Sequence, residues 1–188
     1  MAIPPKEQII LGIDPGTRLM GYGILKIEGK KITVIRYGVI NLLKYTSQEL
    51  KLKKIFERIT QLIEEFLPDE VALEAPFYGK NVQSMLKLGR AQGVAMTAAL
   101  MREIPITEYA PRKVKQSVTG KGTASKEELA TMLEKTLKIK FEDNTLLDAS
   151  DALGVALCHY YQTQTGVKVG KTKSWAAFVK ENPGKVKK

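Results

Sequence analysis

Three extended segments open the chain before any helical periodicity appears, so the fold must begin with a sheet. Residues 8–13, 21–27 and 32–40 are rich in isoleucine, leucine and valine, and the first segment ends at Asp14-Pro15-Gly16, a sequence typical of a turn. The loop between the second and third segments, residues 28–31, contains a glycine and suits a hairpin. Three antiparallel strands are therefore expected at the start of the fold.

Helical and extended patterns alternate after Ser47, which is a suitable N-cap. Apolar residues recur at intervals of three and four between Leu52 and Phe66, which predicts a helix of about five turns that ends before Pro68. The remaining patterns predict a strand over residues 71–74, a helix over 81–102, a strand over 104–109, a short basic helix over 112–118, a helix that begins with the capping box Ser125-Lys126-Glu127-Glu128, and a last helix over 148–161. This order predicts an α/β fold in which a mixed five-stranded sheet carries helices on both faces.

Length and composition set the class of protein. A chain of 188 residues, 44% of them apolar, suffices for one globular domain and is too short for two full-sized ones. We expect a domain over residues 1–166 and a basic tail over 167–188. No run approaches the ~18 apolar residues of a membrane span, and the first eight residues lack the layout of a signal peptide, so a soluble cytoplasmic protein with no membrane partner is expected.

The single Cys158 and the single His159 narrow the chemistry further. One cysteine forms no intrachain disulfide and one histidine builds no histidine-rich metal site, which excludes disulfide scaffolds and zinc fingers. His159 lies eleven residues beyond Asp148, about 16 Å along a helix, so the two side chains are not expected to share an ion. Any metal must be held by oxygen ligands.

Positive charge is concentrated in two segments. The net charge is +10, and residues 75–126 contain nine basic residues against two acidic ones, while residues 168–188 contain seven lysines against one glutamate. Such segments favour binding of a polyanion, because each phosphate that is neutralised releases condensed counterions. A solvated basic face with a lysine tail is the alternative that charge alone leaves open.

Four acidic residues lie where folding does not require an acid. Asp14 and Glu74 each end an apolar strand, and Asp148 and Asp151 are spaced i, i+3 at the start of an otherwise apolar helix. An unpaired carboxylate at the rim of a buried strand costs several kcal/mol, so such an acid usually has a partner or a metal. Taken singly, Asp14 could open a turn and Asp148 could favour a helix N-terminus.

Convergence of the four acids would predict a divalent metal site. Carboxylates brought together repel one another unless a cation is bound, and carboxylate oxygens with water suit Mg²⁺ or Mn²⁺. Two such ions about 3.5–4 Å apart would activate a water molecule and stabilise the leaving oxygen in hydrolysis of a phosphodiester. That reaction requires neither a histidine nor a serine nucleophile.

Five separated segments between residues 9 and 162 resemble the RuvC family of bacterial Holliday junction resolvases. They are ILGIDPGT at 10–17 with GYG at 21–23, Leu73-Glu74 with Phe77, KLGRAQGV at 87–94, YAPRKVKQ at 109–116 and DASDAL at 148–153. The resemblance implies an RNase H-like fold, a homodimer, and Mg²⁺-dependent nicking of two strands of a four-way DNA junction. It also implies cooperation with the branch-migration proteins RuvA and RuvB.

The resemblance also assigns roles to individual residues. It implies that Asp14, Glu74, Asp148 and Asp151 are catalytic acids that hold two Mg²⁺ ions, with Mn²⁺ as a substitute, and that Phe77 stacks on an unpaired base. Lys115 and Lys126 match basic positions near the scissile phosphate, and Arg112 and Lys113 are expected to contact other phosphates. From the residues alone, Phe77 could instead be buried under its own loop, and the lysines could be solvated surface residues.

Some alternatives remain open in the sequence. Gly89 and Gly93 would suit either a close contact between helices of a dimer or packing of their helix on its own sheet. Trp175 and Phe178 could anchor the tail on this chain or on a partner. Rival functions are another RNase H-like nuclease such as an RNA/DNA hybrid nuclease, a non-catalytic junction-binding protein, and an actin-like ATPase, which would require two such domains.

Overall fold

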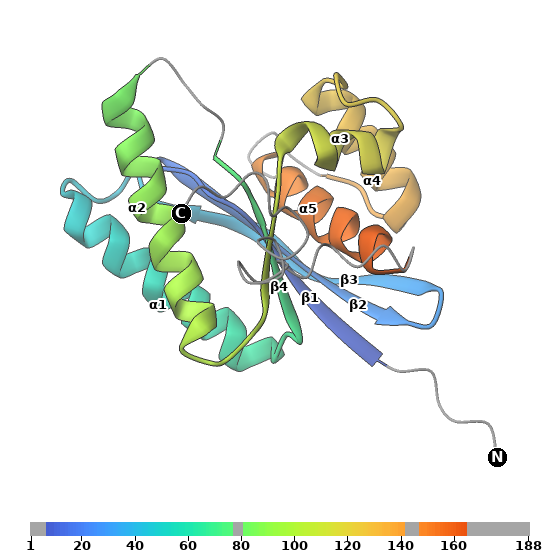
Figure 1. Cartoon of the computed structure of the whole chain (residues 1–188), viewed down its shortest axis with the longest axis horizontal. Coiled ribbons are helices and arrows are strands. Elements are labelled where there is room, and N and C mark those ends of the chain that lie inside the picture. Colours follow the sequence, from blue (N-terminus) through green and yellow to red (C-terminus); the bar gives the residue numbers. More distant parts are fainter. Residues whose placement is uncertain (1–6, 77–80, 142–146, 165–188) are drawn as a thin grey trace, which may run out of the picture.

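The computed structural model describes residues 7–76, 81–141 and 147–164, without the side chains of residues 147 and 148. Its centre is a five-stranded mixed sheet with the strand order β3-β2-β1-β4-β5 (Figure 1). β1 (Glu7–Asp14), β2 (Leu19–Glu28) and β3 (Lys31–Asn41) are antiparallel neighbours, as the opening segments predict. β4 (Glu70–Glu74) lies parallel to β1, and β5 (Ile106–Tyr109) lies parallel to β4. The predicted sheet is therefore confirmed.

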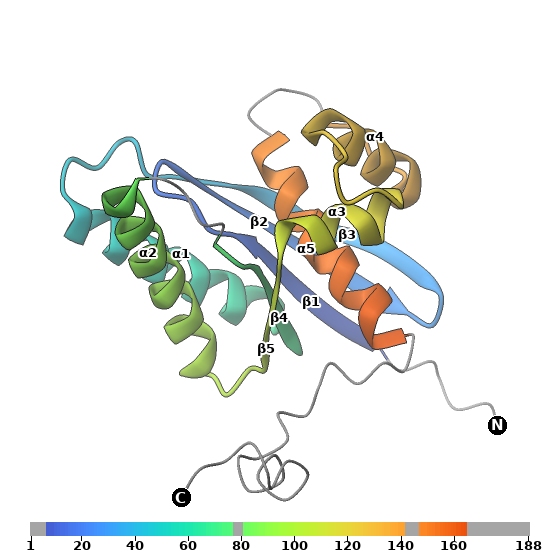
Figure 2. The ribbon, with the colours of Figure 1, turned by 45° about the horizontal axis from the view of Figure 1, so that its top comes forward.

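Helices cover both faces of this sheet (Figures 1 and 2). α1 (Gln48–Phe66) and α2 (Val82–Leu100) pack on one face, and α5 (Leu147–Gln164) packs on the other with α3 (Pro111–Thr119) and α4 (Lys126–Leu137) beside it. Alternate residues of β1 divide between the two layers, since Leu11 and Ile13 join the core under α1 and α2 whereas Ile10 joins the core under α5. No helix in the described part of the chain is long and apolar enough to span a membrane.

The helix ends agree with the local sequence. Ser47 caps α1 by accepting a hydrogen bond from the backbone N–H of Leu50, and Leu67 ends the helix in the left-handed conformation just before Pro68. The predicted capping box is present at α4, where the Ser125 side chain accepts from the Glu128 N–H and the Glu128 carboxylate accepts from the Ser125 N–H. This box places Lys126 at the first residue of α4.

α5 lies unusually close to the sheet. A Cβ atom added to Gly12 would lie 2.1 Å from the carbonyl oxygen of Ala152 and 2.9 Å from the Cβ of Ala156, so only glycine fits at this position of β1. Gly23 on β2 is similar, since a Cβ there would lie 2.7 Å from the Leu153 side chain. The close contact sets the N-terminal turns of α5 near the end of β1 that carries Asp14.

Candidate active site

Asp14 and Glu74 end two neighbouring parallel strands. Ile13 pairs with Leu73 in the register of β1 and β4, and Asp14 and Glu74 are the next residue on each strand. Side chains alternate along a strand, and Ile10 and Ala72 belong to the core under α5. Asp14 and Glu74 therefore lie on the α5 face of the sheet, at the same edge.

Asp151, on the first turns of α5, lies near Glu74. The pKa of Glu74 is raised to about 7, first because the carboxyl is buried and then because the charge of Asp151 is close, while Lys115 and Lys126 act in the opposite direction. A raised pKa of this kind is typical of acids gathered for catalysis or metal binding. Asp148 is the second residue of α5, and its side chain lies outside the described part of the structure.

Two of the predicted basic residues share a hollow with this acid pair. The hollow, of about 330 Å³, is lined by Glu74, Pro111, Val114, Lys115, Lys126, Leu129 and Asp151. The Nζ atom of Lys126 lies 3.1 Å from Oδ2 of Asp151. α3 begins just after β5 and so brings Lys115 beside the end of β4, and Lys126 comes to the same hollow as the first residue of α4. We call this hollow the acid–lysine hollow.

Asp14 lines a neighbouring hollow of about 400 Å³, formed with residues of the turn that follows β1. Among the side chains that the structure describes, no three acidic, histidine or cysteine residues form a group that would hold a metal ion. That set omits the Asp148 side chain, and the convergence of the four predicted acids therefore stays a prediction. Their donor atoms are carboxylate oxygens, which fit Mg²⁺ or Mn²⁺.

The other predicted DNA contacts lie outside the acid–lysine hollow. Arg112 and Lys113 are exposed on the first turn of α3, and the aliphatic part of Arg112 packs against Gly122, where an added Cβ would lie 2.7 Å from Arg112 Cγ. Phe77 falls outside the described residues, as do Trp175, Phe178 and the whole predicted tail.

The comparison with protein families decides what kind of chain this is. Residues 10–159 match the family model of the crossover junction endodeoxyribonuclease RuvC. The chain belongs to the RuvC family. The matched range includes all four predicted acids and ends before the lysine-rich tail.

Curated and solved RuvC proteins are similar over most of the chain. The crossover junction endodeoxyribonuclease RuvC of Cytophaga hutchinsonii is 61% identical over 181 residues, which are 96% of this chain and 89% of that protein. The protein of the same name from Bacteroides fragilis is 54% identical over the full length of both chains. The Thermus thermophilus RuvC structure superposes with a TM-score of 0.76 at 30% identity, covering 85% of this chain and 97% of that one. The structure of T. thermophilus RuvC in complex with a Holliday junction substrate superposes with a TM-score of 0.77 at 29% identity. This match covers 85% of this chain and 96% of that one. The RNase H-like fold is thereby confirmed.

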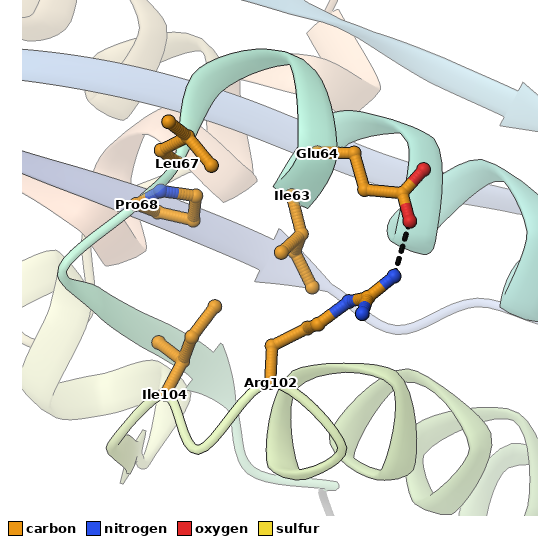
Figure 3. Close-up of a pocket in the computed structure, with 6 residues that line it drawn as sticks. All are labelled: Ile63, Glu64, Leu67, Pro68, Arg102 and Ile104. Atoms are coloured by element: carbon orange, nitrogen blue, oxygen red, sulfur yellow. Dashed lines mark hydrogen bonds and ion pairs between the residues drawn. The ribbon is translucent and has the colours of Figure 1, made fainter.

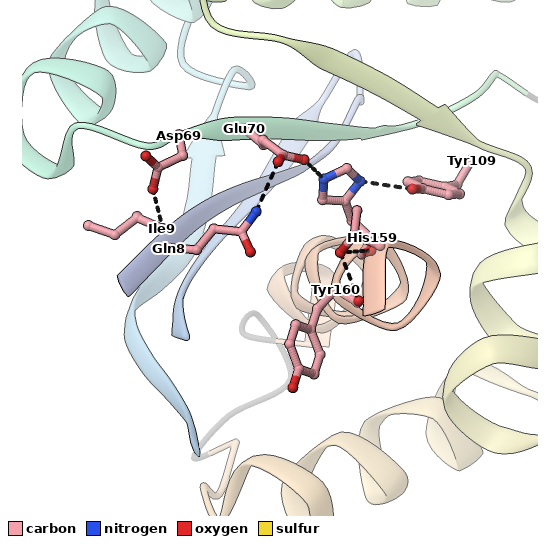
Figure 4. Close-up of polar contacts among 8 residues, drawn as sticks. Gln8, Ile9, Asp69, Glu70, Tyr109, His159 and Tyr160 are labelled. Atoms are coloured by element: carbon pink, nitrogen blue, oxygen red, sulfur yellow. Dashed lines mark hydrogen bonds and ion pairs between the residues drawn. The ribbon is translucent and has the colours of Figure 1, made fainter. Parts of the chain in front are cut away.

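This RuvC-family chain also contains a buried polar cluster that the sequence analysis did not find. His159 is 2% exposed on α5, with one ring nitrogen against the Tyr109 hydroxyl and the other against the Glu70 carboxylate (Figure 4). Both ring nitrogens of His159 therefore have protein partners. A lone histidine among apolar residues of a helix is the only sign of this cluster in the sequence.

A larger hollow, of about 520 Å³, lies away from the acids. It is formed where α1 and α2 end, and an ion pair between Arg102 and Glu64 crosses it (Figure 3). Pro68 and Ile104 line it just before β4 and β5 begin, so it lies at the opposite end of these strands from Glu74. This hollow is therefore separate from the predicted catalytic acids.

Proposed function

We propose that this chain is a structure-selective endodeoxyribonuclease that resolves Holliday junctions by paired, symmetric nicks in homologous recombination and DNA repair. Family membership supports the reaction class, and the observation that carries the proposal is the acid–lysine hollow. There, the partly buried Glu74 and Asp151 line the same hollow as Lys115 and Lys126. Acids to hold a metal and cations to hold a phosphate are the two requirements of phosphodiester hydrolysis without a protein nucleophile.

The four acids would hold two Mg²⁺ ions, with Mn²⁺ as a substitute. Bound there, the ions would supply an activated water and stabilise the leaving oxygen. The raised pKa of Glu74 supports this role, because a buried carboxyl beside a second acid is poorly stabilised as an anion until a cation is present. Asp14 and Asp148 would complete the set from β1 and from the start of α5.

The basic residues would orient the DNA. Lys126 reaches Asp151 from the first turn of α4, and Lys115 lines the same hollow, so both would contact the phosphate next to the cut. Arg112 and Lys113, exposed on α3, would contact phosphates farther along the strand. Phe77, three residues beyond Glu74, would stack on a base unpaired at the crossover.

An apolar stripe on α2 supports a homodimer. Val82, Leu86 and Leu100 are exposed, and they lie in one line with Gly89 and Gly93 at intervals of three, four and seven residues. A Cβ atom added to either glycine would touch nothing within 4 Å, whereas the residues of α2 that pack inward are Ala91, Gln92, Ala95, Ala98 and Ala99. The glycines are therefore free to meet the same helix of a second copy across a twofold axis.

The wider setting follows from the family. We expect a cytoplasmic enzyme that acts together with RuvA and RuvB, which would move the branch point before cleavage. Dimerisation would place two active sites on one four-way junction, which is the arrangement that paired nicks require.

Incubation of the purified chain with a synthetic four-way junction, with and without Mg²⁺, tests the proposal. We expect paired nicks at symmetric positions in the junction when Mg²⁺ is present and none when it is absent. A linear duplex should remain uncut. Cleavage of an RNA/DNA hybrid in preference to the junction would favour a different RNase H-like nuclease. Binding without cleavage at any Mg²⁺ or Mn²⁺ concentration would favour a junction-binding protein.

A further inference from the structure

Four buried or half-buried polar side chains form a continuous chain of hydrogen bonds on the α5 face of the sheet (Figure 4). The Tyr109 hydroxyl lies 2.8 Å from Nδ1 of His159, Nε2 of His159 contacts Glu70, and the Gln8 amide donates to the other oxygen of Glu70 at 2.9 Å. A neutral imidazole with its proton on Nε2 satisfies this arrangement, since it donates to Glu70 and accepts from Tyr109. Burial raises the pKa of Tyr109, so its hydroxyl keeps its proton.

These residues join the elements that carry the predicted acids. Gln8 is on β1 with Asp14, Glu70 is on β4 with Glu74, and His159 is on α5 with Asp151. Tyr109 ends β5, pairs in register with Glu74, and comes just before the helix that carries Lys115. One imidazole ring therefore connects α5 to two strands of the sheet.

The contact between α5 and β1 at Gly12 is close and is made by small residues. Gly12 lies against the backbone of Ala152 and the methyl group of Ala156, with no long side chain on either partner. Apolar contacts between small residues are non-directional. Other contacts that hold α5 include the Leu153 side chain over Gly23 and the hydrogen bonds from Cys158 and Gln162 to the Ser117 hydroxyl on α3. A slide by one residue moves the helix about 1.5 Å, and a displacement of about 1 Å is enough to lower a rate about 100-fold. Directional hydrogen bonds at His159 oppose this movement.

We propose that His159 is a positioning residue for the active site. By bonding to Glu70 and Tyr109, it fixes the axial position and rotation of α5, and hence the placement of Asp151 and of position 148 opposite Glu74 and Asp14. It lies eight residues beyond Asp151, about 12 Å along the helix, so it acts without touching the DNA or the ions. This role rests on the proposed function, because it requires the acids of α5 to serve at the metal site.

Three variants, each removing a different set of hydrogen bonds, test the positioning role of His159. His159→Phe keeps the ring volume and removes both hydrogen bonds, whereas Tyr109→Phe removes only one. His159→Gln places an amide nitrogen near the position of Nε2 and retains the bond to Glu70. Ile59→Val, in the core on the opposite face of the sheet, is the control for a general loss of stability. Each protein is measured by Mn²⁺ titration calorimetry, by single-turnover junction cleavage and by junction affinity in Ca²⁺, all well below its melting temperature.

We expect His159→Phe to weaken Mn²⁺ affinity about 10-fold or more and to slow cleavage about 10- to 100-fold, with junction affinity within about twofold of wild type. Tyr109→Phe should lower Mn²⁺ affinity and the cleavage rate by a smaller factor than His159→Phe does. His159→Gln should retain much of the affinity and rate that His159→Phe loses, and Ile59→Val should match wild type. If His159→Phe fails to fold, Tyr109→Phe decides: unchanged Mn²⁺ affinity and cleavage would overturn the positioning role. Equal losses in Ile59→Val would overturn it as well. A wild-type chain that leaves the junction uncut would instead overturn the proposed function, and with it this role.

Discussion

The ammonium nitrogen of Lys126 lies 3.1 Å from a carboxylate oxygen of Asp151, although 25 residues separate them along the chain. Lys126 also lowers the pKa of Glu74, in opposition to burial and to Asp151. The lysine thus acts on both described acids of the hollow. Its charge keeps Glu74 closer to the ionised form that a metal ion requires.

Replacing Lys126 with glutamine should shift the pH dependence of cleavage. Loss of the positive charge raises the pKa of Glu74, so the rising limb of the profile should move to higher pH. The measurement is the single-turnover rate from pH 5.5 to 9 at a fixed, subsaturating Mg²⁺ concentration. Lys121→Gln is the matched control, because Lys121 is exposed in the loop before α4 and does not line the acid–lysine hollow. If the rising limb of the pH profile lies at the same pH in Lys126→Gln as in wild type, Lys126 does not set the pKa of Glu74.

Glu74 should make the metal-free protein less stable as the pH rises. Its pKa is raised to about 7 in the folded protein from 4.5, so the folded state binds this proton more tightly than the unfolded chain does. The stabilising contribution of the neutral carboxyl is complete below pH 4.5 and is lost as the pH passes through about 7. Glu74→Gln should therefore stabilise the metal-free chain by about 1–3 kcal/mol at pH 8 and have little effect at pH 4.5.

Urea unfolding of wild type and Glu74→Gln in EDTA, at pH 4.5 and pH 8, measures this difference directly. Saturating Mg²⁺ at pH 8 should reverse the order of stability, because only the wild-type carboxylate binds the cation. If Glu74→Gln is as stable as wild type at both pH values, the raised pKa of Glu74 is contradicted.

Phe77→Ala should impair cleavage far more than junction affinity. The predicted role of the ring is to stack on a base that is unpaired at the crossover, which is worth about 1–3 kcal/mol and is needed only when the junction opens. Phe77→Trp retains a stacking surface and should preserve most of the rate. Cleavage and binding measured on the same junction separate the two effects, and equal loss of both in Phe77→Ala would indicate a packing role.

The exposed stripe of α2 makes a prediction about assembly. Leu86→Glu places a charge on the proposed dimer contact and should give a monomer in sedimentation velocity at micromolar concentration, with loss of paired nicks. Leu67→Glu is the control, because Leu67 is also exposed but lies beyond the end of α1. Monomeric wild type, or a dimer that Leu86→Glu leaves intact, would be evidence against this contact.

Much of the fold was predictable because its signals are local. The opening hairpin, the capping box at Ser125 and the strand ends at Asp14 and Glu74 depend on residues close together in the sequence. The start of the last strand was harder to predict. The residues before it join the turn after α2, where Glu103 is left-handed and Ile104 donates to the carbonyl of Ala99, so β5 begins at Ile106 rather than at residue 104.

The site was less predictable because its contacts are distant along the chain. Composition placed Lys126 in a basic segment, but nothing in the sequence placed it against Asp151. The partner of His159 is more distant still, since Glu70 lies 89 residues away and resembles any surface acid at the start of a strand. Such pairs are set by the packing of α4 and α5 on the sheet, which local propensity does not encode.

The most direct measurement of the central claim compares Asp14→Asn, Glu74→Gln, Asp148→Asn and Asp151→Asn on one synthetic junction. Each change removes a metal-binding charge and leaves the lysines in place, so we expect cleavage to fall at least about 1,000-fold in Mg²⁺ while junction affinity stays within about threefold of wild type. Folded variants that still cut the junction at rates near wild type would contradict the assignment of these four acids to one metal site.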